Sequence, residues 1–136
     1  MSLLSNYLQD TPMKAVNSVG GFRIYPSSSA MAEAANRVVA AIGQLNDGMD
    51  RLNRERVLTD SQRAIIDSLP KDSPLTQKHH FLQMATRRIW QSALHCQRER
   101  NSQYGIHQNT LEDTGARLIA CAEQWRQFKH DLDRKE

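Results

Sequence analysis

The stretch MAEAANRVVAAIGQLNDGMDRL, residues 31–52, decides the fold of this chain. Its apolar residues recur at alternating spacings of four and three, which places a narrow apolar seam along one helix and is typical of helices packed side by side. Gly43 and Gly48 each weaken a helix by about 1 kcal/mol, and Asn46-Asp47-Gly48 is a turn signal. Because the seam continues in register through this point, we expect one helix from residue 30 to about residue 57. The seam comprises Met31, Ala35, Val38, Ile42, Leu45, Met49 and Leu52.

Two later stretches repeat the same spacing. The first contains Leu75, Leu82, Ile89, Ala93 and Cys96, and the second contains Leu111, Leu118, Ala122, Trp125 and Leu132. They predict helices from Pro74 to about residue 101 or 103 and over about 110–134, the latter opened by a capping box of Asn109 and Glu112. A short helix over 60–69, capped by Thr59 or Asp60, is expected before them. The predicted fold class is therefore all-α, an antiparallel helical bundle of three long helices and one short helix.

Residues 1–29 differ from the rest of the chain. Two short β-prone runs between Val16 and Tyr25 flank Gly20-Gly21, which resembles a hairpin turn, but an isolated hairpin is only marginally stable in water. We expect an extended N-terminal arm with little regular structure, whether packed on the bundle, donated to a neighbouring chain or flexible. The predicted organisation is an arm over 1–29 and a helical bundle domain over 30–136.

Composition limits the class of protein. The chain has 136 residues, a net charge of +3, 6% aromatic residues and two cysteines, and its mean hydropathy is −0.65. No apolar run approaches the roughly 20 residues of a membrane-spanning helix, and the first residues do not resemble a secretory signal. Cys96 and Cys121 are expected about 10 Å apart along the bundle axis, beyond disulfide reach. We therefore expect a cytoplasmic protein with reduced thiols and no contact with membranes.

Sequence motifs for catalysis or metal binding are missing. There is no nucleophile elbow, no phosphate-binding glycine loop and no CxxC or Glu-x-x-His spacing. His79 and His95 are more than four helical turns apart, and His95 and Cys96 diverge by about 100° on a helix. The sequence predicts a non-enzymatic protein with no cofactor, no metal and no small-molecule ligand.

The helix that begins at Pro74 carries large apolar residues outside its seam, which are Phe81, Trp90 and Leu94. Two interpretations are open. The helix is central and touched on both sides, or this second stripe is an exposed docking surface in which Trp90 is an anchor. The preferred function is a protein-interaction module, such as an adaptor, a chaperone-like factor or a regulatory factor, that self-associates as a homo-oligomer or binds another protein. Phe22 and Tyr25 of the arm are further candidate interface residues.

The alternative function is a helical nucleic-acid-binding regulator that uses the basic helix 75–103. Residues 75–107 have a local charge of +4, because five basic residues face Glu99 alone, and arginine side chains bind phosphates as hydrogen-bonding forks. The same arginines could equally cover the outer face of a bundle. A helix-turn-helix at 60–74 is disfavoured by two prolines in the break and by the length of the second helix. The candidate phosphate contacts are Lys78, Arg87, Arg88, Arg98 and Arg100.

Overall fold

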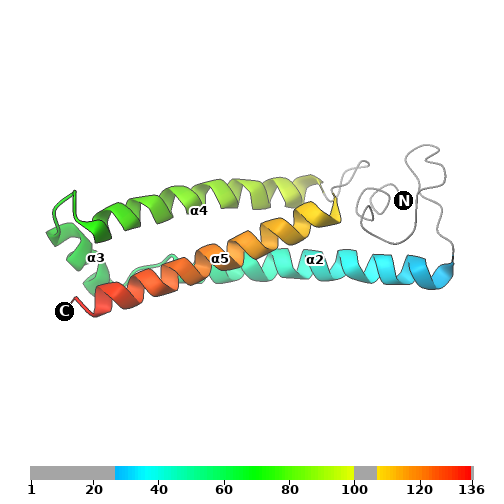
Figure 1. Cartoon of the computed structure of the whole chain (residues 1–136), viewed down its shortest axis with the longest axis horizontal. Coiled ribbons are helices and arrows are strands. Elements are labelled where there is room, and N and C mark those ends of the chain that lie inside the picture. Colours follow the sequence, from blue (N-terminus) through cyan, green and yellow to red (C-terminus); the bar gives the residue numbers. More distant parts are fainter. Residues whose placement is uncertain (1–26, 100–106, 136) are drawn as a thin grey trace.

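The computed structural model describes residues 27–99 and 107–135 of the chain. These residues form four helices, α2 (Ser28–Glu55), α3 (Asp60–Ser68), α4 (Pro74–Glu99) and α5 (Gln108–Asp133). The described part of the chain has no β-strand. The prediction of an all-α bundle with three long helices and one short helix is confirmed (Figure 1).

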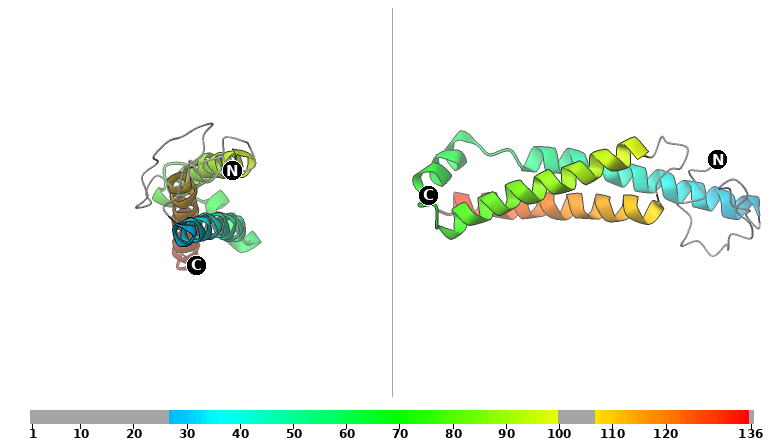
Figure 2. Two further views of the ribbon diagram at one scale, coloured as in Figure 1. Left: turned by 90° about the vertical axis from the view of Figure 1, so that its right-hand side faces the viewer. Right: turned by 90° about the horizontal axis from the view of Figure 1, so that it is seen from above.

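The long helices alternate in direction. α4 runs opposite to α2 and α5, so α2 and α5 run parallel to each other (Figure 1). α5 packs along both of the other long helices, whereas α2 and α4 contact each other at few residues. The central helix of the bundle is therefore α5, and the interpretation that α4 occupies the centre is wrong. The N-terminal end of α2 extends past the ends of α4 and α5 (Figures 1 and 2).

Most helix ends follow their predicted caps. Ser27 caps α2, where its side chain accepts a hydrogen bond from the backbone of Ala30. Thr59 caps α3 through a capping box with Gln62, and α4 begins at Pro74 as predicted. The predicted capping box at the start of the last helix is wrong, because α5 begins at Gln108 with His107 as a cap that makes no side-chain hydrogen bond.

The buried face of α2 is rotated from the predicted seam. Met31 is 48% exposed, and Ala35 and Ile42 are only half-buried. The other four residues of the predicted seam are buried, namely Val38, Leu45, Met49 and Leu52, and the small residues Ala34, Ala41 and Gly48 are buried with them. Of these small residues, Gly48 lies where α5 comes close to α2.

Gly48 and Gly115 show how close α2 and α5 come. A Cβ atom on Gly48 would lie 2.8 Å from Leu118 Cβ and 3.1 Å from the carbonyl oxygen of Gly115. A Cβ on Gly115 would lie 3.3 Å from the backbone nitrogen of Leu45. Gly48 is thus a packing residue inside a continuous helix, and the single helix predicted through Asn46-Asp47-Gly48 is confirmed.

The seams of α4 and α5 agree with the sequence. All the predicted seam residues of both helices are buried, except that Leu75 is half-buried. Cys96 lies beside Thr114, with Sγ 3.6 Å from Oγ1. Because Thr114 precedes Cys121 by seven residues of the same helix, the two thiols are about 10 Å apart along the axis. Both are free and buried.

The short helix α3 closes one end of the bundle. Gln62 Nε2 donates a hydrogen bond of 3.0 Å to Asp133 Oδ1, which holds α3 on the last turn of α5. α2 and α5 are joined by two ion pairs, Arg51 with Glu123 and Lys129 with Glu55 at 3.0 Å. The predicted arm lies outside the described residues up to residue 26, and its last two residues belong to α2. None of the described helices is long and apolar enough to cross a membrane.

Candidate functional site: the groove between α2 and α4

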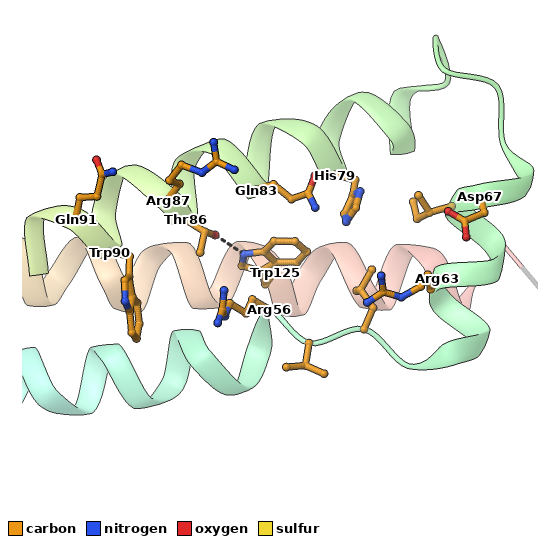
Figure 3. A pocket seen from close by; sticks show the side chains of 13 residues that line it. Arg56, Arg63, Asp67, His79, Gln83, Thr86, Arg87, Trp90, Gln91 and Trp125 are labelled. Atoms are coloured by element: carbon orange, nitrogen blue, oxygen red, sulfur yellow. Dashed lines mark hydrogen bonds between the residues drawn. The ribbon is translucent and has the colours of Figure 1, made fainter. Parts of the chain in front are cut away.

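A cavity of about 540 Å³ opens where α2 ends and the chain crosses to α3. The groove is bounded on one side by α4 and on the other by the link 56–59, directly after α2, and by α3, with α5 beneath (Figure 3). It forms because α2 and α4 both pack on α5 and scarcely on each other. Its volume lies in the range of ligand-binding clefts, about 300–1,000 Å³. We call it the α2–α4 groove.

Three arginines from three different elements line the α2–α4 groove. Arg56 follows α2, Arg63 lies on α3 and Arg87 lies on α4. Figure 3 shows Arg56 and Arg63 on either side of Trp125, and Arg87 at the edge of α4. None of the three forms an ion pair with a carboxylate among residues 27–99 and 107–135. Among the described residues, Asp67 is the one acidic residue that lines the groove, so the described wall carries an excess of positive charge.

The bottom of the groove is a buried aromatic cluster. The His79 ring lies edge-on to Trp125 and is stacked on Phe128, with both centroid separations 5.8 Å. Trp125 and Phe128 meet edge to face at 5.9 Å. The indole of Trp125 is 2% exposed, and its Nε1–H donates a hydrogen bond of 2.7 Å to Thr86 Oγ1 (Figure 3). These contacts fix the shape of the groove's base.

The environment of His79 favours its neutral form. Burial lowers the pKa of His79 below its ordinary value, the nearby Arg63 guanidinium and His80 lower it further, and Asp67 opposes the shift. The ring therefore adds no charge to the groove at neutral pH. The positive charge of the groove at that pH comes from its arginines.

Two apolar side chains give the groove a surface that a partner could contact. Val57, in the link after α2, is 63% exposed, and Trp90 on α4 is half-buried against the core. The Arg56 guanidinium carbon lies 5.9 Å from the centroid of the Trp90 ring, a cation–π contact across the groove. Trp90 is thus held next to a cation at one end of the site (Figure 3).

The predicted docking stripe does not form a single surface. Trp90 lines the groove, and Leu94 lies one turn further along α4 and is exposed. Phe81, 52% exposed, is nine residues before Trp90 on a continuous helix and therefore lies about 180° around it. The ammonium group of Lys78 lies 5.1 Å from the centroid of the Phe81 ring. Phe22 and Tyr25 lie outside the described residues.

The predicted basic helix does not present one basic face either. Lys78 and Arg87 are nine residues apart and lie on opposite sides of α4, whereas Arg98 is within about 20° of Arg87. Arg88 points about 100° away from Arg87. All four side chains are exposed, and Arg100 is outside the described residues. Of the candidate phosphate contacts, only Arg87 lines the groove.

The polar groups of the groove are a hydroxyl, arginines, glutamines, Asp67, His79 and an indole. Its one hydroxyl, Thr86 Oγ1, accepts from Trp125 and lies 3.5 Å from Cys121 Sγ, with no base hydrogen-bonded to it among the described residues. Within the described ranges no three His, Cys, Asp or Glu side chains group to hold a metal ion. Arginine forks, glutamine amides and an indole bind anionic and apolar groups.

Sequence reasoning missed Arg56, Arg63 and Asp67 as site residues. They occupy a link and a short polar helix, and only the packing of α3 against α5 brings them to α4. Thr86 could have been identified from the sequence, because it occupies the α4 seam between Leu82 and Ile89. A polar residue at such a position needs a buried hydrogen-bond partner.

Comparisons with known proteins found no match. No protein-family model, curated protein or solved structure matches this chain.

Proposed function

We propose that this chain is a non-enzymatic protein-interaction module that binds its partner in the α2–α4 groove. The observation that carries the proposal is the set of three arginines, Arg56, Arg63 and Arg87, that converge on one cavity without a carboxylate partner in the described chain. The three side chains are exposed, and Arg56 Nε donates a hydrogen bond of 3.2 Å to Asn53 Oδ1. Arginines beside an indole are a common composition of binding hot spots.

The aromatic residue at the groove edge supports the same function. Trp90 is half-buried and supported by the core, so its position is set before any partner arrives. A pre-positioned aromatic side chain loses little conformational freedom on binding. The proposal includes self-association, in which the partner is a second copy of this chain.

Nucleic-acid binding by α4 has less support. Phosphate contacts along a duplex need several cations on one face of a helix, and Lys78, Arg87 and Arg88 point in different directions around α4. The arginines of the groove come from three elements and surround a concave site. A folded protein segment suits such a site better than a regular duplex backbone.

Two measurements test the proposed function on the full chain. The first is the mass by light scattering at low and moderate salt. The second is selection from a display library of random peptides without compositional bias, followed by affinity measurement on wild type, Trp90→Ala and Phe81→Ala. We expect either a dimer that dissociates on Trp90→Ala, or peptides whose affinity falls about tenfold or more in that variant.

Phe81→Ala is the matched control, because it removes an exposed aromatic ring from the opposite side of the same helix. Far-UV circular dichroism checks that both variants keep their helices. A monomer for which no selected peptide distinguishes Trp90→Ala from wild type would contradict the proposed function.

A further inference from the structure

We infer that the partner segment is an acidic amphipathic helix of another protein, seated between α4 and the wall formed by the link 56–59 and α3, with its carboxylates on Arg56, Arg63 and Arg87. This inference rests on the proposed function and adds the charge and the conformation of the ligand. Three features of the groove carry it.

The first feature is charge. Among the described residues, Arg56, Arg63 and Arg87 line the groove together with one carboxylate, that of Asp67. Arg63 and Asp67 are one helical turn apart on α3, a spacing that allows an ion pair, yet no contact within 4 Å joins them. Elsewhere, Arg51 and Lys129 pair with glutamates of the neighbouring helix. The arginines of the groove are therefore available to carboxylates that arrive with a partner, each of which can accept two parallel hydrogen bonds.

The second feature is the nature of the walls. The long wall is α4, whose backbone groups are hydrogen-bonded within the helix, and the other wall is the link 56–59 with the short helix α3. The described residues contain no β-strand, so the groove offers no sheet edge to pair with an extended peptide. Side-chain polar groups on the walls include the arginines, Gln83 and Gln91. The backbone of a helical ligand is already hydrogen-bonded, so such a ligand needs only side-chain contacts and would pack along α4 as a further helix of the bundle.

The third feature is the apolar surface between the charges. Trp90 and the 63% exposed Val57 lie on opposite walls of the groove. A helix that fits them presents apolar residues on one face at spacings of three and four, with acidic residues on the flanks that face the arginines.

The experiment uses the peptides selected on the full-length protein. Peptides that lose affinity in Trp90→Ala are sequenced, synthesised and titrated by fluorescence anisotropy. We expect Asp and Glu to outnumber Lys and Arg in them, helical circular dichroism on binding, and weaker binding as salt increases. The double variant Arg63→Gln with Arg87→Gln should lower their affinity at least about tenfold. The double variant Arg117→Gln with Arg126→Gln removes the same charge from exposed sites on α5 outside the groove and should leave the affinity unchanged.

Each contrary result has a separate meaning. Groove-dependent peptides that are neutral, basic or bound in extended form would overturn the acidic helix and leave the proposed function standing. Equal losses in the control double variant on α5 and in the groove double variant would overturn it as well, because the effect would then be one of net charge. A labelled oligothymidylate that binds in the groove and displaces the peptides at moderate salt would replace the acidic helix by single-stranded nucleic acid. A dimer that dissociates on Trp90→Ala, without groove-dependent peptides, would overturn the acidic helix and support self-association. A monomer without any groove-dependent peptide would contradict the proposed function itself.

Discussion

Trp125 on α5 and Thr86 on α4 are joined by a hydrogen bond of 2.7 Å inside the core. The bond satisfies the only polar atom of a nearly buried indole and fixes the ring at the base of the α2–α4 groove. Thr86 Oγ1 also lies 3.5 Å from Cys121 Sγ, so one hydroxyl links the two helices at two points. The contact between α4 and α5 thus has a polar centre, which selects one relative position of the two helices.

Replacing Thr86 by valine tests this link. Valine has nearly the shape of threonine but leaves the Trp125 N–H buried without an acceptor, which costs about 1–3 kcal/mol. We expect the free energy of unfolding in urea to fall by that amount. Thr86→Ser keeps the hydroxyl and should lose less stability than Thr86→Val. A valine variant as stable as wild type would show that the hydrogen bond contributes nothing.

The two glycines of α2 should respond to alanine with opposite signs. Nothing lies within 4 Å of a Cβ at Gly43, so Gly43→Ala should stabilise the protein by up to about 1 kcal/mol through helix propensity. At Gly48 a Cβ would lie 2.8 Å from Leu118 Cβ, and Gly48→Ala should destabilise by about 1–3 kcal/mol through overpacking. Thermal and urea unfolding of both variants measure the contrast. Equal stabilisation by the two substitutions would mean that α2 and α5 do not approach at Gly48.

The pH dependence of stability should contain a contribution from His79. Because burial chiefly, and then Arg63, lower its pKa in the folded state, the unfolded chain takes up a proton before the folded one as the pH falls. Stability is therefore complete above the unfolded pKa of about 6.5 and is lost as the pH falls from there toward the folded pKa. Urea unfolding between about pH 5 and 8 should show a shallower loss for His79→Gln than for wild type.

His95→Gln is the control for this prediction, because His95 is an exposed histidine of the same helix. It should follow the wild-type pH profile. An identical profile for His79→Gln and wild type would mean that His79 is as readily protonated in the folded protein as in the unfolded one.

Gln62 connects the cap of α3 to the end of α5. Its Oε1 accepts from the Thr59 backbone N–H at 2.9 Å, and its Nε2 donates to Asp133. Gln62→Glu keeps the acceptor but places a second carboxylate beside Asp133, which should lower the free energy of unfolding by about 1 kcal/mol at low salt and by less at high salt. The second substitution Asp133→Asn should restore most of the loss. A loss that is independent of salt and of Asp133 would indicate that only the cap is affected.

Sequence and structure agree where the determinants are local. Thr59 and Pro74 set the starts of α3 and α4 because capping geometry involves residues within one turn of each other. The start of the last helix was placed wrongly, because Asn109 and Glu112 also satisfy the pattern of a capping box and only the backbone shows that α5 begins before them.

The packing of the helices against one another was harder to predict from the sequence. The seam assigned to α2 favoured large residues such as Met31 and Ile42, whereas the structure buries Ala34, Ala41 and Gly48. A small residue contributes little to the hydrophobic pattern of a sequence. Whether it is buried depends on how closely another part of the chain packs against it. Likewise, Phe81 and Trp90 looked like one surface in the sequence, and helix geometry puts them on opposite sides of α4.

By itself, the sequence determined the all-α class, the three long helices with one short one, and most of their ends, because hydrophobic periodicity and caps act over a few residues. Tertiary structure alone decided that α5 is the central helix and that Arg56, Arg63 and Arg87 meet in one groove. These relationships join segments far apart in the chain. They depend on the close approach at Gly48 and Gly115 and on the hydrogen bond from Gln62 to Asp133, which no local pattern encodes.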